Sequence, residues 1–405
     1  MKRLIGYTAA LCLLAMMVGC GGVSSTGTLA YVSNSTGTGF TVFTVNTDGT
    51  LTKSSISPQN TVAAPKMLQF TANGKWAYFL DDAGNYIYGY TRAGNGDLST
   101  LINNQGTFVG GAGGASSLVI SSNSEYLIVA LPSTLNGALA VFQIDSATGL
   151  LSNVSSPLQV GYKIQQLILN GTELYGLSPT QAAIVSFSVN TSTGAVTQSP
   201  NTASVGIKPI WMILSANGQF MYVLDAVATT TIFGTNGSGQ TVPIGSSPNI
   251  YGFTASGGIT SNSAMPGSPF PENPDAITGI FPTNPVAGVT SNDSRFLFIA
   301  NRGNTSPSIS AYTINSASGE PTEVKGSTTT VNGIQVSSAS PFSCGAGCNP
   351  SFAIVSNTNN ALYMLDTADN KIFQFAIDQN TGRIRALNPT FIAPDGPNPT
   401  WITIR

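Results

Sequence analysis

Histidine is absent from all 405 residues of this chain, and charged residues make up only 8% of it. Without an imidazole, the chain lacks the most common general base of hydrolytic sites and a frequent ligand of zinc. The 15 Lys and Arg residues nearly balance the 17 Asp and Glu residues, which leaves a net charge of −2. Because the basic residues are scattered and form no run, we expect no nucleic-acid partner.

Several catalytic and cofactor signatures are also missing. The sequence has no Gly-x-Ser-x-Gly elbow, no phosphate loop and no dinucleotide-binding glycine fingerprint before a helix. No loop has the dense Asp-x-Asp-x-Asp pattern of a calcium site, although Asp81, Asp82 and Asp366 remain candidate oxygen ligands for a cation. We therefore expect neither a cofactor nor a bound metal.

The first residues have the form of an export signal. Lys2 and Arg3 precede an apolar run, residues 4–18, which is too short to be a good permanent membrane span. The run ends at Met17-Val18-Gly19-Cys20-Gly21, which resembles a bacterial lipobox. An ordinary cleaved signal peptide with an incidental cysteine is the alternative.

This resemblance implies three segments. Residues 1–19 are expected to be a lipoprotein signal peptide, and residues 20–28 a lipidated Cys20 followed by a flexible tether. The rest of the chain, residues 29–405, would then be held at the bacterial cell envelope through a lipid anchor, on its periplasmic side or at the cell surface. The sequence does not choose between these two faces.

Two of the four cysteines lie close together in Pro-Phe-Ser-Cys-Gly-Ala-Gly-Cys-Asn-Pro, as Cys344 and Cys348. An oxidising compartment favours a disulfide between them, and the two glycines permit a tight loop. Free thiols and a metal site stay open as alternatives, but two cysteines alone do not complete a zinc site. A redox-active pair is a further alternative, but the spacing of the two cysteines differs from the Cys-x-x-Cys redox motif.

The strongest positive signal is a unit that recurs about every 47 to 50 residues. Each copy contains an apolar strand, typically with an aromatic residue near its middle. The copies are Leu29–Asn34, Trp76–Asp81, Tyr126–Ala130, Leu174–Ser178, Phe220–Asp225, Phe296–Asn301 and Ala361–Asp366. Short strands repeating at this period predict an all-β fold, a seven-bladed β-propeller with four antiparallel strands in each blade.

The two ends of the repeat array complement each other. Residues 401–404 look like a first strand without a blade, and residues 29–34 look like a second strand without a first. Pairing the two closes the ring and removes its open edges, so we expect one propeller over residues 29–405.

Two insertions interrupt the period, at about residues 226–290 and 326–350. Long insertions of this kind are expected to be loops on one face, either functional or merely tolerated. Phe270 and Phe281 in the first insertion are candidate anchors for a partner.

The motif Tyr31-Val32-Ser33-Asn34 and its variants resemble the Tyr-Val-Thr-Asn repeat of the seven-bladed lactonase-like proteins, whose named enzyme is 6-phosphogluconolactonase. The resemblance covers nearly all of residues 29–405. For the family members credited with catalysis, the resemblance implies a catalytic site made of Glu, Arg and His. This chain has no histidine, so that site cannot be transferred to it. A phosphorylated sugar would also require clustered Lys or Arg, and these are not present.

Polar residues after the second strands and between the blades should gather on one face of the central channel. They are Asp81, Asp82, Asp225, Asn301, Arg302, Asp366, Lys66, Lys163, Lys208 and Asp395. Asp366 or Asp225 is a candidate base, and Arg302 or Lys208 a candidate partner for an oxyanion. Asp81, Asp82, Lys208 and Asn301 are candidates for ligand binding. The alternative is that Asp and Asn after a strand bind the backbone of their own turn.

Taken together, these patterns favour a monomeric binding or scaffold module for a protein, peptide or glycan, rather than an enzyme. A divergent lactonase with a carboxylate base is the alternative, and a wholly structural envelope protein is a third reading. Fold alone does not choose among them.

Overall fold

The computed structural model describes residues 27–37, 39–102, 106–110, 114–235, 238, 240–272, 281–303, 307–326, 328–331, 334–337, 340–345 and 347–405. The predicted signal peptide, the predicted lipidated Cys20 and the tether as far as residue 26 lie outside these residues. Within the described part, no helix has both the length and the apolar character needed to cross a membrane. Helix there is limited to the 3₁₀ turn η1 (Ser261–Ser263).

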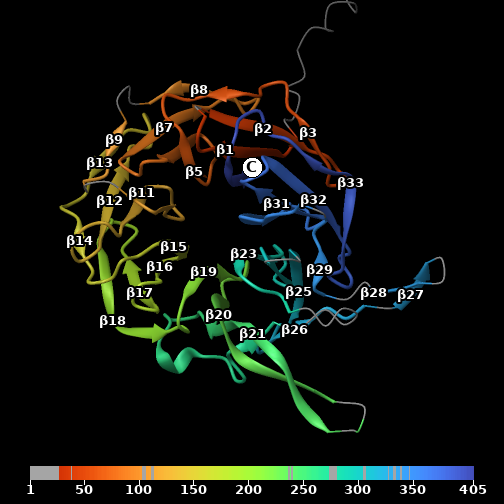
Figure 1. Cartoon of the computed structure of the whole chain (residues 1–405). Helices are drawn as coiled ribbons and strands as arrows, with labels where there is room; N and C mark the ends of the chain where they lie inside the picture. Colours follow the sequence, from red (N-terminus) through yellow and green to blue (C-terminus); the bar gives the residue numbers. More distant parts are fainter. Residues whose placement is uncertain are drawn as a thin grey trace, which may run out of the picture.

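Seven small antiparallel sheets stand in a ring, so the predicted seven-bladed propeller is confirmed (Figure 1). We number the blades from the one that contains β1. The innermost strands of blades 1 to 7 are β34 (Pro399–Ile404), β5 (Pro65–Phe70), β10 (Ser117–Ile120), β15 (Gln166–Asn170), β19 (Pro209–Leu214), β23 (Pro285–Thr290) and β30 (Phe352–Val355). The second strands are β1 (Leu29–Asn34), β6 (Trp76–Asp81), β11 (Tyr126–Leu131), β16 (Glu173–Ser178), β20 (Phe220–Thr235), β24 (Phe296–Asn301) and β31 (Ala361–Asp366).

The outer half of each blade follows the same order. The third strands are β2 (Gly39–Val45), β7 (Tyr86–Arg92), β12 (Ala138–Ile144), β17 (Ala183–Val189), β21 (Thr241–Thr254), β25 (Ser308–Ile314) and β32 (Lys371–Ile377). The outer strands are β3 (Leu51–Lys53), β8 (Leu98–Leu101), β13 (Leu151–Asn153), β18 (Val196–Ser204), β22 (Phe270–Pro271), β26 (Pro321–Glu323) and β33 (Ile384–Ile392). Four short strands add to the third strands of blades 1, 2, 3 and 6: β4 (Gln59–Asn60), β9 (Thr107–Phe108), β14 (Leu158–Gln159) and β29 (Phe342–Ser343).

The ring closes as the sequence predicts. Strand β34 pairs antiparallel with β1, with Ala30 opposite Ile404 and Val32 opposite Ile402. Blade 1 is therefore built from both ends of the described chain, and the inner edge of β1 is covered by β34.

The core is divided among the seams between neighbouring blades. Seven separate apolar clusters are buried, and each draws its residues mainly from two adjacent sheets. All six residues of β1, β6, β11, β24 and β31 are buried. These strands are covered on both faces, which is why their sequences are continuous apolar runs rather than alternating ones.

A recurring tyrosine of the second strand links five of the seven blades to the next one. In five blades its buried hydroxyl donates to a backbone carbonyl in or near a turn of the following blade, at 2.5 to 2.7 Å. The pairs are Tyr31–Gly96, Tyr78–Gly149, Tyr175–Ala255, Tyr222–Gly319 and Tyr363–Gly49. Blade 6 has Phe298 at this position, and blade 3 has Ile128. The repeated aromatic is thus a structural link between blades.

The insertions differ from the loops we expected. Much of the first one lengthens β20 and β21 into a hairpin that projects from the ring, and the second contains the hairpin β27 (Thr328–Val331)–β28 (Ile334–Ser337) (Figure 1). Phe270 is 8% exposed and packs in the core between blades 5 and 6, so its expected role as a partner anchor is wrong. Phe281 is partly buried and lies over Gly245 of the projecting hairpin.

Candidate functional site

A proline and a bulge begin the innermost strand of four blades. Pro65, Pro285 and Pro399 each lie opposite the last residue of the second strand, Pro209 lies opposite Asp225 within the longer β20, and in all four the register shifts directly afterwards. Proline is tolerated at the first residue of a strand, and a bulge redirects the side chain beside it. Lys66 and Thr400 follow two of these prolines and line a cavity at the channel.

This channel cavity has a volume of about 240 Å³. Its lining comes from blades 1, 2, 3, 5 and 7, and consists of Lys66, Met67, Asp82, Ser116, Trp211, Ser351, Phe352, Thr400 and Trp401. A second cavity, of about 150 Å³, shares Met67, Ser116, Trp211 and Trp401 with it. The cavity therefore combines one ammonium, one carboxylate, three hydroxyls and an aromatic wall.

The aromatic wall is formed by three rings in contact. Phe352 lies 5.7 Å from Trp211 and 4.5 Å from Trp401, measured between ring centroids. Both indole N–H groups are already used, by the Gly288 carbonyl and by Thr403 Oγ1, at 3.0 Å each. The indoles therefore offer a ligand hydrocarbon surface. The hydroxyls of Ser116, Ser351 and Thr400 donate to backbone carbonyls at 2.9, 3.1 and 3.4 Å, so they are available to a ligand mainly as acceptors.

Lys66 is the cation of this cavity. Its Nζ lies 3.4 Å from the Ala115 carbonyl, and its side chain is partly buried. Burial lowers the pKa of Lys66, while the nearby Asp82 and Asp81 oppose that effect. Lys66 and Asp82 are the two charged residues of the predicted face that line the same cavity.

Asp81 and Asp225 are used by the backbone. Asp81 Oδ1 accepts from the N–H groups of Asn85 and Tyr86 at 2.7 and 2.8 Å. Asp225 is 0% exposed and accepts from the N–H groups of Ile207 and Lys208 at 2.7 and 2.9 Å. Each carboxylate thus holds a turn or a connecting loop, which is the alternative that the sequence left open.

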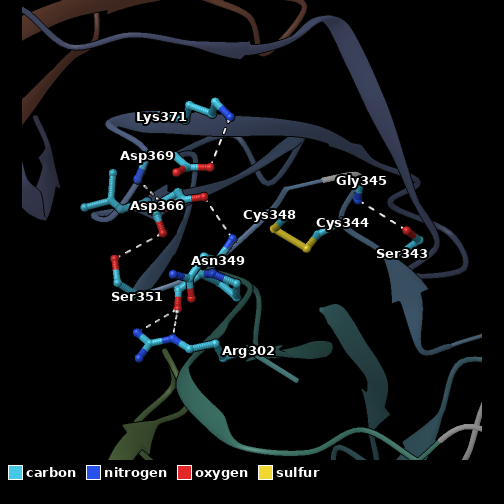
Figure 2. The surroundings of a disulfide bond; sticks show 12 residues. Arg302, Ser343, Cys344, Gly345, Cys348, Asn349, Ser351, Asp366, Asp369 and Lys371 are labelled. Atoms are coloured by element: carbon cyan, nitrogen blue, oxygen red, sulfur yellow. Dashed lines mark hydrogen bonds and ion pairs between the residues drawn. A yellow bond between two sulfur atoms is a disulfide. The ribbon is translucent and has the colours of Figure 1, made fainter. Parts of the chain in front are cut away.

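Asp366 has a similar environment in blade 7 (Figure 2). It is 0% exposed, and its two oxygens accept from the N–H groups of Asn349 and Asp369 at 2.8 and 3.0 Å. Arg302 donates from Nε and Nη2 to the Pro350 carbonyl at 3.3 and 3.2 Å (Figure 2). Asp366 and Arg302 therefore hold the same connecting segment, residues 349–351, from two neighbouring blades.

The remaining candidates do not join this group. Lys163 and Lys208 are exposed. Asp395 forms an ion pair with Lys53 and accepts from Ser57 Oγ. Asn301 is buried in the seam between blades 5 and 6, away from solvent. The structure thus brings together Lys66 and Asp82, and it distributes the others among turns, seams and the surface.

The predicted disulfide is present. Cys344 and Cys348 are bonded, and both are buried in the core between blades 6 and 7 (Figure 2). The bond closes the loop directly before Asn349 and Pro350, so it braces the segment that leads to Ser351 and Phe352 in the channel cavity. No group of three or more metal-binding side chains occurs among the described residues.

Sequence reasoning missed Glu272, which is 0% exposed. Its Oε2 accepts from Ser310 Oγ at 2.6 Å and from Asn301 Nδ2 at 3.0 Å. Burial raises the pKa of this carboxyl to about 7. The available signal was that residues 226–271 contain no charged residue and Glu272 follows directly.

The fold is shared with several solved structures. A putative 6-phosphogluconolactonase from Bacteroides fragilis has a TM-score of 0.66 at 15% identity, over 95% of this chain and 99% of that one. A second protein of the same description, from Bacteroides uniformis, has a TM-score of 0.68 at 14% identity, over 94% and 100%. The Pseudomonas aeruginosa periplasmic gluconolactonase PpgL has a TM-score of 0.61 at 17% identity, over 93% and 98%.

At these identities the likeness establishes the lactonase-like propeller fold and not the chemistry. No protein-family model and no curated protein matches the chain in sequence.

Proposed function

We propose that this chain is a lipid-anchored envelope protein of the lactonase-like propellers, and that it binds a small molecule in the channel cavity. One observation carries this proposal. The cavity of about 240 Å³ offers an apolar aromatic wall beside an ammonium, a carboxylate and three hydroxyls. A compact ring with one apolar face and several polar substituents, such as a sugar unit, fits such a lining, because its face can lie on the indoles.

Binding is favoured over hydrolysis by the state of the carboxylates. Asp225 and Asp366 are 0% exposed, and both oxygens of each accept backbone hydrogen bonds. Asp81 Oδ1 holds its own turn, and none of the three carboxylates lines the channel cavity, so none is placed to take a proton from a water molecule there. Asp366 and Arg302 retain their predicted catalytic roles only if the connecting segment they hold is released.

A lactonase remains the second candidate because one of the similar structures is a gluconolactonase. In this alternative the base is Asp82, which is exposed, and the Lys66 ammonium on the same cavity stabilises the developing oxyanion. The pair replaces the Asp366 and Arg302 assignment that the sequence favoured.

The test uses the chain without its predicted leader. Plain and phosphorylated sugar lactones and the corresponding free sugars and sugar acids are offered, with the uncatalysed hydrolysis subtracted. Binding without turnover, weakened at least tenfold by Lys66→Met, supports the binding module. Turnover that is lost in Asp82→Asn and retained in the matched control Asp395→Asn supports the lactonase. Neither binding nor turnover on any compound, by a folded protein, refutes the channel cavity as a site for sugar-like ligands.

A further inference from the structure

Glu272 ties two blades together. It follows β22 of blade 5, where its N–H donates to the Pro248 carbonyl at 3.2 Å and its own carbonyl accepts from Ser247 Oγ. Its side chain crosses the seam to Ser310 and Asn301 of blade 6. The backbone of Glu272 therefore belongs to blade 5, and its carboxyl group belongs to the polar interior of blade 6.

This carboxyl group lies among buried oxygens without partners. Among the described residues, neither Glu272 Oε1 nor Asn301 Oδ1 has a hydrogen-bond partner. Within the part of the chain that the structure describes, the titratable groups that face Glu272 are Tyr312 on β25 and Glu323 on β26, and Glu323 raises the pKa of Glu272 further. Among the described residues, no ion pair includes Glu272.

The protonation state therefore decides whether the seam is stable. Neutral Glu272 gains an O–H donor in a cluster that contains an unpartnered amide oxygen, and it carries no buried charge. Ionised Glu272 places a negative charge out of reach of water, beside another acidic residue. A buried unpaired charge is relieved by protonation or by admitting water, and the second route loosens the seam.

A short path leads from this seam to the channel cavity. Asn301, which donates to Glu272, is followed by Arg302, and the Arg302 guanidinium holds the Pro350 carbonyl (Figure 2). The next two residues, Ser351 and Phe352, line the cavity. Displacement of Asn301 would therefore move Arg302 and release one of the contacts that position the cavity wall.

We propose that Glu272 is a proton-operated latch, which closes the seam between blades 5 and 6 when protonated and loosens both the seam and the channel cavity when ionised. The effect on the seam is inferred from the Glu272 cluster alone. The functional relevance of the effect on the channel cavity rests on the ligand site proposed above. The direction follows from the raised pKa of an acid. The stabilisation is complete below the ordinary glutamate value of 4.5, and it is lost as the pH rises toward and through about 7.

The seam is tested by amide hydrogen exchange between pH 5.5 and 8.5, corrected for the intrinsic pH dependence of exchange. For β22, β24 and β25 we expect the opening equilibrium of the natural protein to rise about tenfold per pH unit from pH 5.5 to about 7, the slope of one proton, and to level off above about 7, where Glu272 is ionised in both the closed and the open state. Glu272→Gln, which keeps the shape and stays neutral, should abolish the slope. Glu320→Gln, an exposed change in blade 6, should leave it intact.

Two results overturn the latch. One is the same pH slope in Glu272→Gln as in the natural protein. The other is that the amides of β22, β24 and β25 recover full protection from exchange at pH 8.5 when CaCl₂ or NaCl alone is added at constant ionic strength. That result would make the oxygen cluster around Glu272 a cation site.

The link to the cavity has its own readout, which needs no ligand. Acrylamide quenching of Trp211 and Trp401, in a Trp76→Phe background, should increase as the pH rises from 5.5 through about 7 and then level off. Arg302→Ala should leave the exchange slope of the seam in place and remove the pH dependence of quenching. Quenching that titrates equally in Arg302→Ala contradicts the path through Pro350. Because quenching and exchange are measured without ligand, failure of the latch is distinguishable from failure of the ligand site.

Discussion

Replacing Phe298 by tyrosine is expected to stabilise the ring. Phe298 occupies the position at which five other blades have a tyrosine that donates to a carbonyl of the next blade. The surroundings repeat as well. A Cβ on Gly382 would lie 2.5 Å from Phe296, as a Cβ on Gly319 would lie 2.4 Å from Phe220. Because Tyr222 reaches the Gly319 carbonyl in that equivalent seam, the hydroxyl introduced by Phe298→Tyr should reach the Gly382 carbonyl.

The size of the effect follows from a single buried hydrogen bond. A neutral hydrogen bond of this kind contributes about 0.5–1.5 kcal/mol to the free energy of unfolding. The converse change, Tyr222→Phe, removes the bond to Gly319 and leaves a carbonyl without its partner, so it should cost about 1–3 kcal/mol. Both are measured as shifts of the guanidinium unfolding midpoint at unchanged slope.

The two variants together make the result decisive. If Tyr222→Phe destabilises and Phe298→Tyr also destabilises, the seam between blades 6 and 7 has no room for the hydroxyl, and the inferred equivalence of the seams is refuted. If Tyr222→Phe has no effect, the linking bonds themselves contribute nothing, and the reasoning fails at its first step.

Three further changes follow from the same structure. Deleting Pro399–Arg405 removes the inner strand of blade 1, and we expect loss of the cooperative unfolding transition in circular dichroism; a transition of unchanged midpoint contradicts this. Gly319→Ala forces a side chain into a backbone with φ of +76° and against Phe220, and should lower the free energy of unfolding by about 2 kcal/mol or more, whereas Gly94→Ala, where nothing lies within 4 Å, should change it by less than about 0.5 kcal/mol. Replacing Cys344 and Cys348 by serine opens a short loop and should cost about 2 kcal/mol, and added reductant should then have no further effect on the unfolding midpoint.

Much of the fold could be predicted from the sequence because the repeat encodes it many times. Each apolar run with a central aromatic, such as Phe220–Asp225, lies on a strand buried on both faces. The unpaired segments at residues 29–34 and 401–404 predicted the closing pair, since each lacked a complement. The first insertion was misread as a loop because its many prolines and glycines suggested breaks. Thr230 to Thr235 nevertheless pair with residues of β21 through the backbone, although their sequence has no clear period-two pattern of apolar residues.

The candidate site was harder to predict, and the reason is physical. A strand-end aspartate such as Asp366 can face the channel or accept from its own backbone, and the choice depends on loop conformation rather than on residue type. Lys66 and Asp82 reach the cavity because a bulge and a turn direct them there. Glu272 lies outside every repeated motif, and its burial depends on contacts with a different blade.

The closure of the ring also determines when the protein can finish folding. The backbone of Leu29 exchanges hydrogen bonds with that of Arg405, at 2.7 and 2.8 Å. During synthesis β1 is therefore made first among the described strands, and its partner β34 is made last. Until then the apolar Leu29–Val32 edge remains open to other strands, and the contact that protects it spans nearly the whole chain. We therefore expect blade 1 to be the last to form and the most prone to aggregation in newly made chains, so that final assembly is a late and slow event.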